Sequence, residues 1–207
     1  MIINYMKEYV FKTIFLGNTG VGKSSILSRK KSNVFDPDCR STIGIDFVSL
    51  EKMVDDVNIK IHVWDTAGQD KYENIVQSYY REIAGAFLVY NVNDKKSIES
   101  INNWIDRIKY FSPDCEIVIV GNQADLNQTI KLDGIDDIPN QLTCSAKTGI
   151  GINEVFDCMI NMLCKKISSP NFNLIKSQGI SIYEEFNFTE ENHNINLKKN
   201  YKCCNLL

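Results

Sequence analysis

The stretch GNTGVGKSS, residues 17–25, is the most informative part of this chain. Its spacing, Gly17-x-x-x-x-Gly22-Lys23-Ser24, matches a P-loop, and it lies between an apolar run and a segment that can be helical. Glycines allow the backbone N–H groups to turn inward around an anion, and the N-terminus of the following helix adds to the attraction. The stretch therefore predicts a polyphosphate site between a strand and a helix. Its expected residues are Gly17, Asn18, Thr19, Gly20, Val21, Gly22, Lys23, Ser24 and Ser25.

Two side chains of this stretch have specific expected roles. Lys23 supplies a positive charge to the β- and γ-phosphates, and the Ser24 hydroxyl can bind Mg²⁺. A P-loop by itself indicates only a nucleoside triphosphate. Kinases and ATPases therefore remain possible until another part of the chain identifies the base.

The sequence GNQAD, residues 121–125, follows an apolar strand and is expected to read that base. The carboxylate of Asp125 can accept two hydrogen bonds from the N–H groups of guanine, a donor pair that adenine does not offer. A buried polar site left unpaired by the wrong ligand discriminates by roughly 10⁴ or more. Further along, backbone amides near the end of the next strand can meet the guanine carbonyl. The expected base-binding residues are Asn122, Gln123, Asp125, Ser145, Ala146 and Lys147.

The sequence WDTAGQ, residues 64–69, and Thr42 upstream indicate a magnesium site and a switch. Asp65 is placed to hold Mg²⁺ through water, and Thr42 to supply a second hydroxyl ligand. The Gly68 amide can face the γ-phosphate, and Gln69 can orient the attacking water, because phosphoryl transfer needs positioning and charge stabilisation. Both segments would be held only while a γ-phosphate is present, so we expect them to order with triphosphate and relax with diphosphate.

Composition limits the other classes of protein. The chain has 207 residues, 43% of them apolar, and a net charge of −3, which predicts one main domain and gives no electrostatic support for nucleic-acid binding. Seven cysteines without framework spacing favour a reduced, cytosolic protein. The N-terminus lacks the apolar region of a signal peptide, and no apolar run approaches membrane-spanning length.

Apolar segments alternate with helical patterns along the chain, which predicts an α/β fold with a mainly parallel sheet covered on both faces. The residues around Asp55 read as a hairpin and therefore as one antiparallel edge pair. Apolar stripes over 98–108 and 152–163 indicate core-facing helices, the first capped by Asp94 or Ser97. The expected strands are 9–16, 57–64, 84–92, 116–121 and 141–144.

The C-terminal part of the chain has a different composition. From about Ser168 onward it is rich in Asn, Ser, Lys and Glu without a steady period, which predicts a flexible tail over 169–202 after a domain over 7–168. The last five residues, 203–207, begin with Cys203 and Cys204, and the final four fit a prenylation box ending in Leu. One lipid anchors a protein marginally and two anchor it firmly.

These motifs occur in order, and the chain resembles the Ras superfamily of small GTPases and, within it, the Rab family over about residues 9–166. The Rab-like features are IGIDF at 43–47, Lys60-x-x-x-Trp64, YYR at 79–81, LVY at 88–90 and the terminal cysteine pair. The resemblance implies the P-loop small-GTPase fold, a six-stranded, mostly parallel sheet with one antiparallel edge strand. It also implies that Phe35 stacks on the guanine and that two geranylgeranyl groups are attached at Cys203 and Cys204.

The resemblance further implies a functional cycle. The protein is expected to be a monomer that hydrolyses GTP slowly, recruits effectors when GTP-loaded and serves vesicle trafficking. Its expected partners are an exchange factor, a GTPase-activating protein, an escort protein that inhibits GDP dissociation, and effectors. The expected location is the cytosolic face of internal membranes, with an escorted cytosolic pool. The expected effector-binding residues are Ile43, Gly44, Ile45, Asp46, Phe47, Trp64 and Tyr79.

Some positions depart from the family pattern. Gln123 replaces the family lysine that packs against the base, which predicts weaker nucleotide binding. Thr19 lies where bulk near the γ-phosphate can slow hydrolysis. These two residues motivate an alternative function, a guanine-nucleotide-dependent scaffold with little hydrolysis. The segment between Asp125 and Ser145 is short and lacks a clean helical stripe, so we expect its helix to be trimmed or missing.

Overall fold

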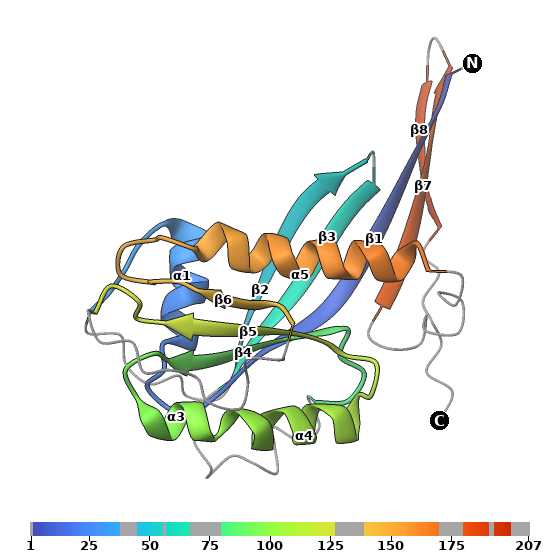
Figure 1. The fold of residues 1–207 in the computed structure, drawn as a ribbon. Coiled ribbons are helices and arrows are strands. Elements are labelled where there is room, and N and C mark those ends of the chain that lie inside the picture. The colour runs from blue at the N-terminus through green and yellow to red at the C-terminus, as the bar shows by residue number, and fades with distance from the viewer. Residues whose placement is uncertain are drawn as a thin grey trace.

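The computed structural model describes residues 2–37, 45–55, 57–66, 80–126, 139–169, 180–190 and 193–199. Six strands follow one another across the sheet in the order β2-β3-β1-β4-β5-β6 (Figure 1). Strand β2 runs antiparallel to β3 at one edge, and the other neighbouring pairs are parallel. The predicted mixed α/β sheet is confirmed. The strands are β1 (Ile2–Leu16), β2 (Ile45–Val54), β3 (Val57–Thr66), β4 (Gly85–Asn91), β5 (Glu116–Asn122) and β6 (Gln141–Thr143).

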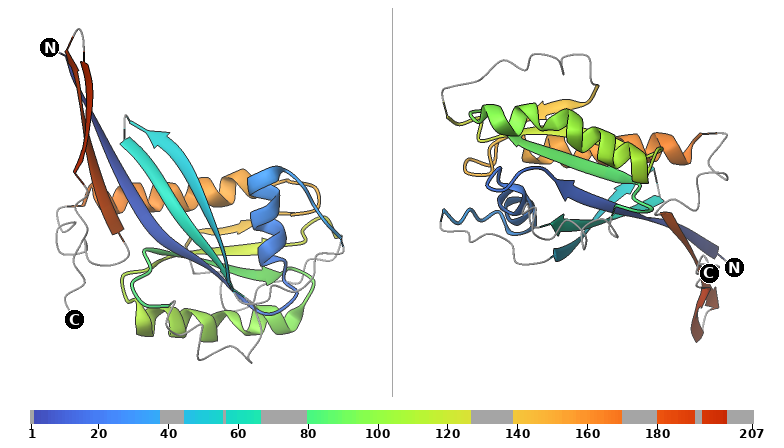
Figure 2. Two further views of the ribbon diagram at one scale, coloured as in Figure 1. Left: turned by 180° about the vertical axis from the view of Figure 1, so that it is seen from behind. Right: turned by 90° about the horizontal axis from the view of Figure 1, so that it is seen from below.

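Helices cover both faces of this sheet, as expected. Helices α1 (Lys23–Ser32) and α5 (Ile152–Ile167) lie over one face, and α3 (Lys95–Glu99) and α4 (Ile101–Phe111) over the other (Figures 1 and 2). Asp94 caps α3, because its side chain accepts a hydrogen bond from the Lys96 amide at 3.1 Å. No helix among the described residues is long and apolar enough to cross a membrane.

Alternate residues of the central strands build two separate cores. The rings of Phe15 and Phe87 stack with their centroids 4.7 Å apart, and the centroid of the Phe87 ring lies 5.1 Å from that of Phe156 in α5. Ile14 and Leu88 belong to the other cluster, beneath α4. Each central strand is therefore buried on both faces, which is why these strands read as continuous apolar runs.

The C-terminal segment differs from the expected flexible tail. Strands β7 (Ile180–Glu190) and β8 (His193–Lys199) extend the sheet to eight strands, with β7 antiparallel to residues 2–11 of β1 and β8 antiparallel to β7. β4 pairs only with residues 13–16 of β1, so the rest of that edge accepts β7. Ile180, opposite Phe11, is 4% exposed and belongs to the core. The sheet therefore includes residues 2–6, before the expected domain start at residue 7, and two strands within the expected tail over 169–202.

The carboxyl ends of the parallel strands meet at one edge of the sheet. The loops that follow β1, β4, β5 and β6 therefore gather there, which is the usual ligand site of an open α/β sheet. The helix expected to be trimmed falls mostly on 127–138, outside the described residues.

Candidate nucleotide-binding site

The loop between β1 and α1 has a backbone that only glycine accommodates at two positions. Gly17 has φ +133°, and a Cβ there would lie 2.1 Å from the carbonyl oxygen of Val89. Gly22 has φ +93°, and a Cβ there would lie 2.2 Å from Nδ2 of Asn122. Gly22 precedes α1 and has no side chain to cap it, so a bound phosphate can take that role.

The side chain of Lys23 is hydrogen-bonded to the backbone of this loop. Its side chain is 6% exposed, and its ammonium donates hydrogen bonds to the carbonyl oxygens of Gly17 and Asn18, both at 2.9 Å. Burial lowers the pKa of Lys23 to about 8, and the nearby Asp65 carboxylate opposes this effect. The positive charge is therefore held in place before a nucleotide arrives.

Ser24 and Asp65 form the candidate magnesium site. The Ser24 hydroxyl donates to Oδ2 of Asp65 at 2.5 Å, and Asp65 is 2% exposed. The Thr66 hydroxyl donates to the carbonyl oxygen of Phe15 at 2.8 Å, which ties the end of β3 to β1. A hydroxyl and a carboxylate are oxygen ligands of the kind that Mg²⁺ prefers, so these residues fit the ion.

Asn122 joins the phosphate loop to the loop after β6. Its Nδ2 donates to the carbonyl oxygen of Val21 at 2.9 Å, and its Oδ1 accepts from the Ala146 amide at 3.1 Å. Gln123, with φ +64°, reaches the carbonyl oxygen of Gly20 at 3.4 Å. The structure therefore brings three predicted segments together through buried or half-buried amides.

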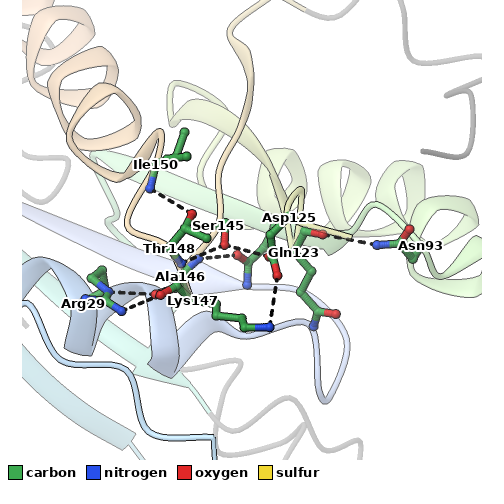
Figure 3. A network of polar contacts seen from close by, with 10 residues as sticks. Arg29, Asn93, Gln123, Asp125, Ser145, Ala146, Lys147, Thr148 and Ile150 are labelled. Atoms are coloured by element: carbon green, nitrogen blue, oxygen red, sulfur yellow. Dashed lines mark hydrogen bonds and ion pairs between the residues drawn. The ribbon is translucent and has the colours of Figure 1, made fainter. Parts of the chain in front are cut away.

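Asp125 is oriented by two neighbours (Figure 3). The Ser145 hydroxyl donates to its Oδ1 at 2.7 Å, and the Lys147 ammonium lies 3.8 Å from its Oδ2. Ser145 in turn accepts a hydrogen bond from the Thr148 amide at 3.1 Å. The carboxylate that we expect to read guanine is thus fixed by the loop that follows β6.

A cleft of about 310 Å³ lies between these segments. Its walls come from the phosphate loop, from the segment after α1, and from the loops after β5 and β6. Phe35, the expected stacking residue, is partly buried and lines this cleft together with Asp125. Seven further predicted residues line it, namely Gly20, Gly22, Ser25, Asn122, Gln123, Ala146 and Lys147.

Five hydrogen bonds of the site were not predicted. The indole N–H of Trp104 donates to Oδ1 of Asn18 at 3.0 Å, and Asn18 donates to the Ser100 hydroxyl at 3.0 Å. The Asn93 side chain donates to the carbonyl oxygen of Gln123 at 3.3 Å. Arg29 donates to the carbonyl oxygens of residues 146 and 147 (Figure 3). No local motif marks these side chains, because their partners lie far away along the chain.

The expected effector surface is partly described. Phe47 of β2 is 43% exposed, and its ring lies 5.0 Å from the ring of Trp64 and 5.0 Å from that of His62. Oδ1 of Asp46 accepts a hydrogen bond from the Phe47 amide at 2.8 Å. Ile45 is paired with Thr66 at the start of β2. The remaining expected site residues lie outside the described ranges: Thr42, Ile43, Gly44, Gly68, Gln69, Tyr79, Cys203 and Cys204.

Comparison with known proteins agrees with this geometry. The Ras family model matches residues 12–165. Among curated proteins, the chain is 35% identical to the Ras-related protein RABA1h of Arabidopsis thaliana, with 84% of this chain and 88% of the relative covered. It is 37% identical to Rab-4 of Dictyostelium discoideum, with 80% and 85% covered, and 35% identical to human Rab-3D, with 78% and 77% covered. The chain belongs to the Rab family of small GTPases.

Membership of the Rab family indicates the class of ligand. Ras-type proteins bind GTP and GDP, and this Rab is a small GTPase of intracellular trafficking. The match over residues 12–165 covers the phosphate loop, the two loops expected to read the base and the helices next to them. The segment 180–199 with its two strands lies beyond that match.

Proposed function

We propose that this Rab binds GTP, hydrolyses it slowly to GDP and phosphate, and recruits effectors while GTP is bound. The observation that carries the proposal is the arrangement of three side chains: Asn122 and Asp125 line the cleft, and Lys23 belongs to the phosphate loop that forms one of its walls. Hydrogen bonds orient both the cation and the carboxylate. A cation that holds polyphosphate and a carboxylate that pairs with guanine are the two recognition elements that GTP requires.

Each end of the nucleotide has a proposed set of contacts. The Lys23 ammonium and the inward amides of 17–25 hold the phosphates. Ser24, with Thr42 and Asp65 through water, holds Mg²⁺, which neutralises charge on the phosphates when it is bound. Asp125 accepts from the N–H groups of guanine, the backbone amide of Lys147 faces the guanine carbonyl, and Phe35 stacks on the ring.

Hydrolysis is assigned to residues that position water. Gln69 orients the attacking water and the Gly68 amide faces the γ-phosphate, while a GTPase-activating protein supplies an arginine in trans. An exchange factor replaces GDP by GTP, and the switch residues with Phe47, Trp64 and Tyr79 bind effectors. Geranylgeranyl groups on Cys203 and Cys204 hold the protein on the cytosolic face of an internal membrane, and an escort protein removes the GDP form.

The test combines nucleotide competition with single-turnover hydrolysis. Labelled GDP should be displaced by GTP and not by ATP, and Gln69→Leu should bind GTP normally while its hydrolysis rate falls at least tenfold, because one water-orienting group is lost. Displacement by ATP would contradict guanine recognition. A normal rate in Gln69→Leu would remove Gln69 from its role, and no turnover in the unmodified protein would favour the non-hydrolysing scaffold.

A further inference from the structure

Arg29 of α1 lies behind one wall of the guanine cleft. Its Nε donates to the carbonyl oxygen of Ala146 at 2.8 Å, and its Nη2 donates to that of Lys147 at 2.6 Å (Figure 3). Ala146 and Lys147 both line the cleft, whereas Arg29 is not among its lining residues. The guanidinium therefore holds two successive peptide units of the base-reading loop from outside.

The same guanidinium also holds the segment that leads from α1 to another wall of the cleft. Its Nη1 donates to the carbonyl oxygen of Asn33 at 2.7 Å and contacts Oδ1 of Asn33 at 3.3 Å. Asn33 ends α1 with φ +56°, and Phe35 follows two residues later on the cleft wall. Arg29 thus joins the base-reading loop to the segment that carries the expected stacking ring.

Peptide geometry turns these contacts into a prediction about recognition. The carbonyl of Ala146 and the amide N–H of Lys147 belong to one planar, trans peptide unit, so they point in opposite directions. A donor that holds the Ala146 oxygen on the α1 side therefore aims the Lys147 N–H away from α1. Three different nitrogen atoms of the rigid guanidinium donate to the three carbonyl oxygens. A lysine has a single nitrogen, so it cannot hold all three carbonyl oxygens in this arrangement.

We propose that Arg29 is a positioning residue for guanine recognition in this Rab: it fixes the peptide between Ala146 and Lys147 so that the Lys147 amide faces the 6-oxo group of the base. The inference rests on the proposed guanine contacts of that loop. Arg29 itself touches no part of the nucleotide in this assignment.

The test measures release of three diphosphates from the full-length, Mg²⁺-loaded protein. GDP carries both recognition groups and inosine diphosphate lacks the 2-amino group, whereas 2-aminopurine riboside diphosphate lacks the 6-oxo group together with the N1–H that Asp125 accepts. Arg29→Met should release GDP roughly tenfold faster or more, the usual effect of losing a hydrogen bond to a charged group. The factor by which loss of the 6-oxo group speeds release should be smaller in this variant than in the unmodified protein. The factor for loss of the 2-amino group, which Asp125 reads, should be unchanged.

Matched variants separate positioning from folding. Lys31→Met removes the same charge from an exposed position of α1 and should release all three ligands like the unmodified protein. Arg29→Lys keeps the positive charge but lacks the forked donors, so its GDP release rate should lie between those of Arg29→Met and the unmodified protein. This variant tests the inference even if Arg29→Met folds poorly.

Two results would overturn the inference: GDP release from Arg29→Met within twofold of the unmodified protein, or equal acceleration of all three ligands, which indicates general loosening. A different result would overturn the proposed function and the inference with it. In that case the unmodified protein itself would show no preference for GDP over the two analogues or over ADP.

Discussion

The hydroxyl oxygen of Ser24 lies 2.5 Å from Oδ2 of Asp65, although the two residues are 41 positions apart. Ser24 is the second residue of α1, and Asp65 lies near the end of β3. The fold thus places the two oxygen ligands of the expected magnesium site in direct contact before the ion binds. This contact leads to the first prediction.

Ser24→Asn should weaken Mg²⁺-dependent GTP binding more than GDP binding, by roughly tenfold or more in the ratio of the two affinities. The longer amide displaces the hydroxyl ligand, and GTP depends more on the ion because Mg²⁺ bridges its β- and γ-phosphates. Affinities measured with and without EDTA check this. Equal losses for GTP and GDP would contradict the metal assignment, and Ser28→Asn, on an exposed site of the same helix, is the control.

The affinity of the nucleotide-free protein for GDP should fall as pH rises above about 8. Burial lowers the pKa of Lys23 to about 8, so the free protein loses this proton near that pH, whereas bound phosphates keep the ammonium charged and raise its pKa. Binding then includes proton uptake above pH 8 and little uptake below it. Calorimetric titration in two buffers of different ionisation enthalpy measures that uptake. A similar uptake in Lys23→Met would assign the effect to another group.

Gln123→Lys should slow GDP release about three- to tenfold. The amide of Gln123 reaches the carbonyl oxygen of Gly20 only at 3.4 Å, whereas a lysine brings a longer apolar stem to the base and a charge-assisted hydrogen bond to the loop. Stopped-flow release of a fluorescent GDP gives the rate. Gln123→Met supplies an apolar stem without a donor, so equal slowing in both variants would assign the gain to packing alone.

Ile180→Ala should destabilise the folded protein by about 2 kcal/mol or more, the range for truncating a buried isoleucine. Ile180 is 4% exposed and lies opposite Phe11, so the loss follows if β7 is docked on β1. Urea unfolding monitored by circular dichroism measures it. Ile150→Ala is the control, because Ile150 is 73% exposed and its change should stay within about 0.5 kcal/mol. Matching curves for the two variants would show that β7 adds no stability.

The sequence predicts those parts of the molecule whose function depends on local spacing. The P-loop needs its glycines at fixed positions, and Asp125 follows its strand directly, so both can be read without a structure. Arg29 could not be found this way, because an arginine in a helix has no signature and its carbonyl partners lie 117 and 118 residues away. Backbone carbonyls are common to all residues, so no side-chain pattern records such a contact.

The second part that sequence reasoning missed is β7. Its residues alternate apolar and polar only in two short stretches, Ile180-Ser181-Ile182 and Phe186-Asn187-Phe188, which Glu184 and Glu185 interrupt. The segment from Ser168 onward as a whole is rich in Asn, Ser, Lys and Glu, a composition typical of unfolded segments. The edge of β1 that β4 leaves open supplies the backbone partners, and that vacancy is a property of the assembled sheet rather than of the tail sequence.

If lipids are attached at Cys203 and Cys204 as proposed, the docking of β7 and β8 limits how far the folded domain can lie from a bilayer. In the strand register, Lys199 of β8 lies opposite Glu184 of β7, and Glu184 lies opposite Lys7 of β1. The end of the last strand therefore returns to the body of the sheet. Cys203 follows four residues later, and an extended chain of that length spans at most about 14 Å. While β8 stays paired with β7, a lipid on Cys203 would keep this Rab close to the membrane surface. Effectors would then bind it within a short distance of the bilayer.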